Sequence, residues 1–320
     1  YTRAIRVDQV KPGLLYAGTE WGMYISFDDG SNWQPFQLNL PIVAIRDLEV
    51  RDNDLIAATH GRSFWIIDDL TPLHQLSDEV AASQFHLFKP DDSYRVYQSG
   101  GWSSPNKKLV GENHPDGVMF HYYLKDLAEK DSVSLKILDS SGSLISTFSN
   151  NNKDKKFAIK PKKGGNRIVW DMRYPGFKEF DGMILYSSPN RGPKAMPGNY
   201  TAQLTVNGKT VEQPFTILKD PRLPNTIEDY KNQFDFLMKV RDKVSEGHQA
   251  IIDIRKTKKD INYLLEKIKG EPDYVQIKTM ADELFKELEV IENNIHMTKN
   301  QSRQDPLNYG IRINNRLAFL

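Results

Sequence analysis

Four side chains with the chemistry of a binding site lie at two short turns near the start of the chain: Glu20, Trp21, His60 and Arg62. A carboxylate, an indole, an imidazole and a guanidinium at one rim would suit a sugar or a peptide as ligand. The alternative is structural, because His60 and Arg62 would equally pair with carboxylates or carbonyls and hold neighbouring sheets together. The choice depends on which elements position the two turns.

Short alternating segments around these turns predict β-strands. Residues 4–8, 14–19, 22–27 and 33–38 alternate apolar and polar side chains between turn residues, and residues 45–50, 54–59 and 63–68 repeat that rhythm without a clear fourth strand. In both groups the candidate residues occupy the turn between the second and third strands. If the two sheets pack side by side in the same orientation, all four residues therefore lie on one face.

A further turn, from Ser26 to Trp33, has a recognisable spacing. In Ser26-x-Asp28-x-Gly30-x-Asn32-Trp33 the short carboxylate can accept N–H groups of its own turn, and Gly30 can adopt a positive φ. We expect Trp33 to bury its ring between neighbouring sheets. This order resembles the Asp box, S/T-x-D-x-G-x-T-W, of β-propellers of the sialidase, sortilin and bacterial BNR-repeat type. The resemblance implies a structural role rather than catalysis or calcium binding.

Composition excludes several classes of function. The chain has 320 residues, no cysteine, and 43 basic against 42 acidic side chains, so its net charge is near +1. This leaves no cysteine nucleophile, no thiolate metal site and no overall field that would hold nucleic acid. The seven histidines lack metal-ligand spacing, and we predict neither metal nor cofactor. Because the chain starts at Tyr1 inside a predicted strand, we expect upstream blades of the same protein as partners.

The middle of the chain, residues 79–222, predicts a linker and a β-sandwich. Its expected strands are residues 118–124, 133–138, 144–148, 155–159, 167–170, 198–206 and 210–217. SLKILDSSGSLISTF, GGNRIVWDM and MPGNYTAQLTVNGKTVEQPF resemble the FlgD-type immunoglobulin-like module of exported bacterial proteins. Two loop-rich stretches stand out. We expect Tyr94, Tyr97 and Trp102 to pin the connection 90–115, or to form a binding patch, whereas residues 173–196 either carry function or pack on the sandwich edge or the propeller.

Residues 223–320 predict a helical hairpin with a C-terminal segment. Thr226 and Asp229 form a helix-start signal, and Gly270-Glu271-Pro272 separates two helical patterns. The first seam comprises Ile227, Tyr230, Phe234, Leu237, Val244, Ile251, Ile254, Ile261, Leu265 and Ile268. The second comprises Ile277, Ala281, Leu284, Leu288, Ile291 and Ile295. Steps of three and four predict that the helices pack antiparallel, with partner binding by the seam as the alternative.

A family resemblance covers nearly the whole chain. GTEWGMYISFDDGSNW, THGRSFWIIDD, GENHPDGV and QDPLNYGIRINNRL resemble large exported bacterial proteins of the BNR-repeat "glycosyl hydrolase" or sortilin-like (VPS10-type) propeller family. The resemblance implies a mainly β fold with an α appendage: the last two blades of a propeller over residues 1–78, the sandwich, and the hairpin. It also implies export to the periplasm, outer membrane or exterior. Asn32 and His114 depart from the family pattern.

Three functions remain open on the sequence. The favoured one is a non-catalytic binding or scaffold part of the cell envelope, whose propeller face binds a peptide or a glycan. A glycoside hydrolase would need paired carboxylates across a cleft, of which Glu20 or Asp47 would be one and a missing blade would supply the other. As a subunit of a larger surface or secretion complex, the chain would use the helical hairpin as its contact.

Overall fold

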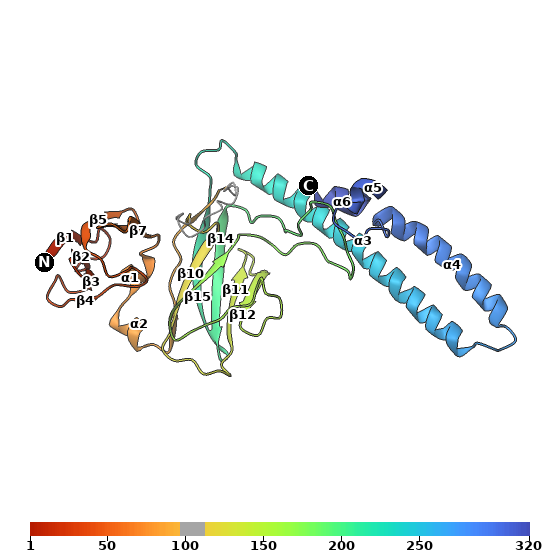
Figure 1. The fold of residues 1–320 in the computed structure, drawn as a ribbon, viewed down its shortest axis with the longest axis horizontal. Coiled ribbons are helices and arrows are strands. Elements are labelled where there is room, and N and C mark those ends of the chain that lie inside the picture. The colour runs from red at the N-terminus through yellow and green to blue at the C-terminus, as the bar shows by residue number, and fades with distance from the viewer. Residues whose placement is uncertain (97–112) are drawn as a thin grey trace. The chain divides into compact units, whose positions relative to one another are not determined.

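The computed structural model describes residues 1–96 and 113–320. The chain divides into two compact units, residues 1–170 with 199–218 and residues 171–198 with 219–320. The first unit contains the strands and the second contains the long helices (Figure 1). The prediction of a mainly β protein with a C-terminal helical region is confirmed at this level. Within the described residues, no helix combines the length and the apolar composition needed to cross a bilayer.

Two antiparallel sheets form the N-terminal part of the first unit. One has four strands in the order β1 (Thr2–Val7), β2 (Leu15–Thr19), β3 (Gly22–Ser26) and β4 (Gln34–Pro35). The other has three, β5 (Ile45–Arg51), β6 (Asp54–Thr59) and β7 (Phe64–Ile67). Buried residues recur between more exposed ones along β5 and β6, as in half-buried strands, whereas β2 and β3 are buried over most of their length. The turns β2–β3 and β6–β7 are the two that carry the candidate residues.

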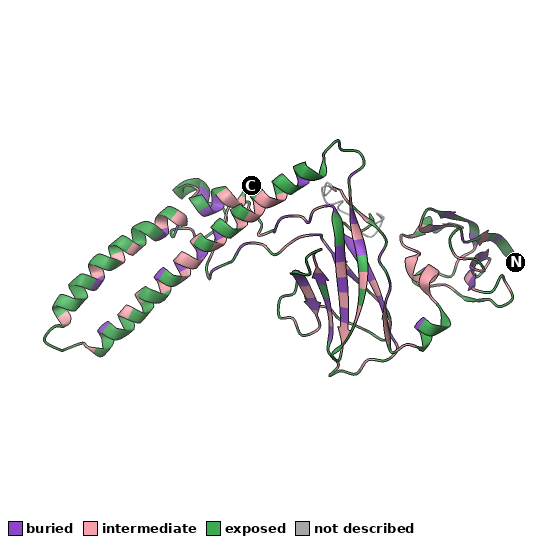
Figure 2. Ribbon diagram, turned by 180° about the vertical axis from the view of Figure 1, so that it is seen from behind, coloured by how far each residue is buried: buried purple, intermediate pink, exposed green. Residues whose placement is uncertain are grey.

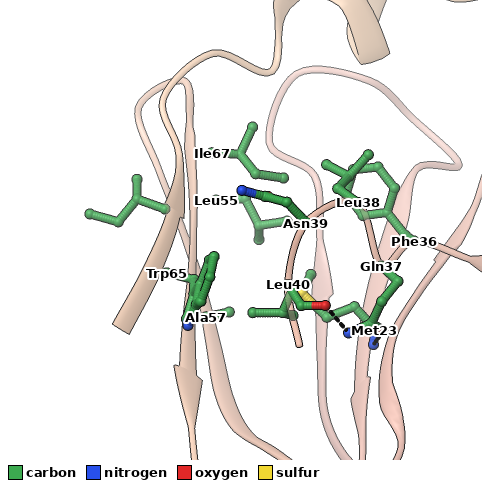
Figure 3. A pocket seen from close by; sticks show the side chains of 11 residues that line it. Met23, Phe36, Gln37, Leu38, Asn39, Leu40, Leu55, Ala57, Trp65 and Ile67 are labelled. Atoms are coloured by element: carbon green, nitrogen blue, oxygen red, sulfur yellow. Dashed lines mark hydrogen bonds between the residues drawn. The ribbon is translucent and has the colours of Figure 1, made fainter. Parts of the chain in front are cut away.

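The two N-terminal sheets share one apolar core. Tyr16, Ile45, Leu48 and Leu55 are almost fully buried in it. Gly18 on β2 allows the close approach, because a Cβ there would lie 2.6 Å from Ile45 Cγ2. Between the sheets remains a cavity of about 40 Å³, which has room for water only (Figure 3). This contact is packed as a core rather than opened as a ligand pocket.

A buried carboxylate fixes the loop that joins β1 to β2. Asp8 is 6% exposed and accepts hydrogen bonds from the backbone N–H groups of Val10 and Lys11 and from the Tyr16 hydroxyl (2.9 Å). His74 Nε2 lies 3.0 Å from the same carboxylate. Burial alone would raise the pKa of Asp8. The hydrogen bonds have the larger effect and hold this pKa below its ordinary value.

The rest of the first unit is a pair of sheets that follows two short helices, α1 (Thr71–Gln75) and α2 (Asp78–Ala82). One sheet has the order β13 (Gly164–Trp170), β10 (Val118–Leu124), β8 (Phe85–Leu87). The other has the order β12 (Leu144–Ser149), β11 (Val133–Leu138), β14 (Gly198–Val206), β15 (Lys209–Lys219), β9 (Ser93–Arg95). Trp170, Phe120 and Phe215 meet edge to face in their core, with ring centroids 5.1 to 6.2 Å apart.

Two expectations for this region differ from the structure or lie outside it. Residues 155–159 do not form the expected strand, and only Ala158 makes an isolated bridge, to Ser149. In the connection 90–115, Tyr94 belongs to β9 and is 51% exposed. Tyr97 and Trp102 lie outside the described residues.

The second unit is built on an antiparallel helical hairpin (Figure 1). α3 (Ile227–Lys267) is a single 41-residue helix that starts with a capping box between Thr226 and Asp229, and α4 (Tyr274–Ile295) returns along it. Two short helices follow, α5 (Asp305–Tyr309) and α6 (Ile313–Ala318), and α6 packs on α3 and α4.

Figure 2 shows α4 exposed over much of its length, with buried and half-buried residues between, and the apolar seam of the helix is divided between these environments. Ala281 is buried and Leu288 is half-buried, which marks the side that packs in the hairpin. Ile277, Leu284 and Ile291, spaced by seven residues, are 43%, 40% and 48% exposed. The sequence pattern identified both rows as one seam, but a two-helix hairpin has only enough neighbouring surface to cover one of them.

The segment 171–198 packs on the helices of the second unit. The rings of Tyr174 and Phe234 lie 4.9 Å apart, and the backbone N–H of Lys178 donates to Ser245 Oγ at 3.0 Å. Phe177 is 8% exposed. The sequence suggested the sandwich edge or the propeller as the packing partner, whereas these contacts are with α3.

A buried polar cluster joins this segment to α3, α4 and α6. The side-chain nitrogen of Asn314 lies 3.0 Å from His248 Nε2 and 3.2 Å from His296 Nδ1, and both histidines are buried. The Phe180 ring meets both imidazoles edge to face. His248 Nδ1 lies 2.5 Å from the carbonyl oxygen of Lys178. The amide therefore donates to two neutral imidazoles, which also contact the Phe180 ring and, for His248, the Lys178 carbonyl.

A buried ion pair lies beside that cluster. Glu292 is 5% exposed and accepts a hydrogen bond from Arg255 Nε at 2.8 Å, and Lys258 Nζ lies 3.7 Å away. Arg255 also donates to the carbonyl oxygen of Asp181 and stacks over Phe180. Burial, and next the nearby Arg255 charge, lower the pKa of His296 to about 4.

Candidate functional site

Glu20 and Trp21 are the two residues of the turn between β2 and β3, and hydrogen bonds fix the backbone of this turn. Thr19 and Gly22 pair directly, so only two residues connect the strands. The Thr19 hydroxyl accepts the Trp21 N–H at 3.0 Å and donates to the Gly22 carbonyl at 3.1 Å. Gly22 takes φ 113°, a conformation that side chains disfavour. The indole of Trp21 is 75% exposed at the tip of this turn.

The turn between β6 and β7 is fixed by equivalent hydrogen bonds. The Thr59 hydroxyl accepts the N–H of Arg62 at 3.1 Å and donates to the Ser63 carbonyl at 2.6 Å. The Arg62 carbonyl accepts a hydrogen bond from Trp65 Nε1. A threonine therefore fixes each turn, and both turns project their following residues outward.

Two arginines that the sequence reasoning missed interact with residues of these turns. Arg3 on β1 forms an ion pair with Glu20. Arg46 on β5 lies 3.1 Å from His60 Nδ1, and its charge also acts on Glu20. The order Arg3, Glu20, Arg46, His60 thus continues from the first sheet to the second. No short-range pattern marks Arg46, because its importance comes only from the contact of β5 with β1 and β2.

The structure brings three of the four candidate residues to one rim and gives the fourth no contact with them. Glu20 and His60 share the neighbour Arg46, and Trp21 is adjacent to Glu20 in the chain. The guanidinium of Arg62 is exposed, and among residues 1–96 and 113–320 it has no ion-pair partner. His60 Nδ1 accepts a hydrogen bond from Arg46 Nε at 3.3 Å.

The electrostatics of the rim favour holding a ligand over proton transfer. The hydrogen bond from Arg3 lowers the pKa of Glu20, and the Arg46 charge acts in the same direction. Glu20 is therefore ionised at neutral pH, the opposite of what a general acid needs. Asp47, the other carboxylate considered for hydrolysis, is 2.6 Å from Arg6 and accepts the Leu48 N–H.

The turn from Ser26 to Trp33 is closed by its own side chains. Asp28 accepts the Asn32 N–H at 2.8 Å, the Asn32 side-chain amide at 2.6 Å and the Ser26 hydroxyl at 2.8 Å. Gly30 has φ 85° and donates its N–H to Ser26 Oγ. Trp33 is 38% exposed, so its ring covers the turn and is not buried between sheets as the sequence suggested.

An acidic hollow of about 350 Å³ lies elsewhere in the first unit. Its described aspartates are Asp52, Asp54, Asp68, Asp69, Asp91, Asp92 and Asp116. Burial raises the pKa of Asp54, and the charge of Asp68 adds to that effect, whereas Asp69 is paired with His121 at 3.1 Å. Among the described residues, no three His, Asp or Glu side chains are placed to hold a metal ion.

Comparison with known proteins adds no assignment to this geometry. No protein-family model matches the sequence. No curated protein matches it either.

Proposed function

We propose that this chain is a non-catalytic binding or scaffold part of an exported bacterial protein, and that the rim formed by Glu20, Trp21 and His60 binds a peptide or a glycan. In this proposal β1–β4 and β5–β7 are the last two blades of an Asp-box propeller. The sheets of β8–β15 are an immunoglobulin- or FlgD-like sandwich, and α3 and α4 are a docking element. Upstream blades of the same protein complete the ring.

The observation that carries the proposal is the exposed indole of Trp21. Burying such a ring against a ligand removes a large apolar area from water, and the ring offers a face for a sugar or for an apolar peptide side chain. The turn fixes the backbone that carries the ring without ligand, so little backbone entropy is lost on binding. Glu20 beside it supplies a fixed charge that orients hydroxyl or cationic groups.

Two features support binding without turnover. Glu20 and Asp47 are each paired with an arginine, and the hydrogen bond from Arg3 lowers the pKa of Glu20, whereas a proton donor needs a raised pKa. Hydrolysis of a glycoside needs two carboxylates about 5–10 Å apart with contrasting pKa values. The glycoside-hydrolase alternative would have to obtain both from blades outside this chain.

The test is a titration of the protein, extended upstream through its remaining blades, against neutral and charged oligosaccharides and against peptides. Binding and release of product are recorded on the same samples. We expect saturable binding of one ligand class without product. Trp21→Ala should weaken that binding by about tenfold, the loss of an aromatic contact of about 1 to 1.5 kcal/mol.

Tyr263→Ala provides the matched control, because Tyr263 is another exposed aromatic residue (63%) and lies on α3 of the second unit. It should leave affinity unchanged. Equal loss in both variants, or turnover that survives Trp21→Ala, would contradict the proposed role of the rim.

A further inference from the structure

The first unit carries a concentrated positive charge that the rim does not use. Residues 153–167 contain six lysines and Arg167 against one acidic residue, a local charge of +6 in a chain whose net charge is +1. Lys163 is paired with Asp126 at 2.7 Å, whereas Lys160 and Arg167 have no carboxylate partner among the ion pairs of the described residues. A charge excess of this density is favourable only where it is solvated or meets an anion.

Part of this charge lines a groove of about 290 Å³. Arg167, on β13, forms one wall, and Lys156 and Lys160 form the other. The floor between them is apolar and includes Tyr122 and Ile168, both buried. Cationic walls above an apolar floor distinguish this groove from a run of solvated lysines.

Both walls are held in place by the fold. Lys156 and Lys160 flank a segment that is fixed to the end of β12, where Ser149 donates to the Phe157 carbonyl and accepts the Ile159 N–H. The rings of Phe148 and Phe157 pack at 5.7 Å beneath it. The groove is therefore present before any ligand arrives.

The opposite wall is the backbone of an outer strand. β13 pairs with β10 on one side only and is the last strand of its sheet. An outer strand offers N–H and C=O groups to any extended chain laid beside it. An added strand would point alternate side chains toward the apolar floor and toward solvent, where the basic residues stand.

We propose that this groove binds an extended acidic peptide segment, with alternating apolar and acidic residues, which adds to the β13 edge. The positive walls exclude a second copy of the same edge, because like charges would meet. Nucleic acid is disfavoured since the aromatic rings at the groove are buried or half-buried and offer no stacking face. A membrane is disfavoured because the basic segment lacks a large exposed apolar side chain.

Edge protection alone would explain one or two lysines near β13, since charged residues guard outer strands against aggregation. It does not explain a fixed second wall or an apolar floor. Arg167 and Lys160, which have no ion-pair partner among the described residues, are the side chains that an acidic segment would neutralise.

The test uses the intact chain and a labelled synthetic peptide of alternating valine and glutamate, about seven residues long to match a strand. Fluorescence anisotropy should show saturable binding that weakens with salt. The double variant Lys160→Glu, Arg167→Glu should bind about tenfold more weakly or worse. The matched control Lys136→Glu, Lys209→Glu makes the same charge change at exposed positions on other strands and should bind like the wild type.

A second peptide separates strand addition from simple charge attraction. N-methylation at alternate residues removes backbone N–H groups and keeps the carboxylates, so it should weaken binding by about tenfold if the β13 edge is used. Equal affinity for the methylated peptide would overturn the proposal, as would equal loss in the control variant. Binding of a sulfated polysaccharide with no binding of the peptide would also overturn it. Circular dichroism checks that each variant is folded, and Lys160→Ala and Arg167→Ala singly replace the double variant if it is not.

Discussion

The buried histidine pair of the second unit makes its stability depend on pH in a calculable way. Burial and the charge of Arg255 lower the pKa of His296 to about 4, against 6.5 for the exposed side chain. Between these two pH values the side chain of His296 is therefore protonated in the unfolded chain and neutral in the folded chain. The contribution of His296 to the stability of the folded chain is therefore complete above about pH 6.5 and is lost as the pH falls toward 4.

Asn314→Asp is the perturbation that tests this reasoning. From about pH 7 to about pH 5, His296 alone should cost the wild type about 2 kcal/mol of unfolding free energy, and His248, whose pKa burial also lowers, adds to the loss. A carboxylate in place of the amide favours the charged imidazoles and raises their pKa values by about 1 to 3 units. For His296 the loss should then shrink to about 1.5 kcal/mol at the smallest of these rises and to about 0.5 kcal/mol in the middle of the range, and it should reverse at the largest.

The assay is urea unfolding followed by far-ultraviolet circular dichroism, because α3 and α4 supply most of the helical signal. Asn262→Asp, an exposed position on α3, is the matched control and should keep the wild-type pH dependence. If all three proteins lose the same stability between the two pH values, the histidines are not the cause and the account of this cluster is wrong.

Four further substitutions test the packing and the buried carboxylate. Gly18→Ala should destabilise the N-terminal sheets by about 1 to 3 kcal/mol, measured by thermal unfolding, because its Cβ would overlap Ile45; an unchanged midpoint would show that the sheets are not in close contact there. Asp8→Ala should lower the free energy of unfolding in urea by about 3 kcal/mol at neutral pH. The loss should be smaller below about pH 4, where the pH approaches the lowered pKa of the carboxyl group. A loss that does not change with pH would contradict the charged state of Asp8. Leu288→Asp should destabilise the hairpin by about 2 to 3 kcal/mol, and Leu284→Asp should destabilise it by less than about 1 kcal/mol, as measured by circular dichroism. A larger effect of Leu284→Asp would contradict the division of the α4 seam.

Local patterns predicted the elements where local chemistry determines them. The turn at Glu20 and Trp21 follows from a threonine and a glycine on either side of two residues, and the start of α3 follows from Thr226 and Asp229. In each case the groups that interact are within four residues in the chain. Sequence reading is strong at this range.

Contacts between distant residues could not be predicted in the same way. The segment 171–198 was expected to pack on other surfaces, but its aromatic residues meet α3, some 60 residues later. Arg46 was missed for the same reason, since its neighbours Glu20 and His60 come from two different turns. A periodic pattern shows that a face is apolar but not which partner covers it, and the α4 seam was therefore read as one surface.

The most direct test of the binding rim observes Trp21 itself. Fluorine NMR of protein labelled with fluorotryptophan gives one resonance for each of the five tryptophans, and Trp21→Phe assigns the relevant one. Adding a ligand that binds should shift the Trp21 resonance and leave that of the buried Trp170 in place, with no product formed. An unchanged Trp21 resonance at saturation, or accumulation of cleaved product, would contradict the proposal that this rim binds a peptide or glycan without turnover.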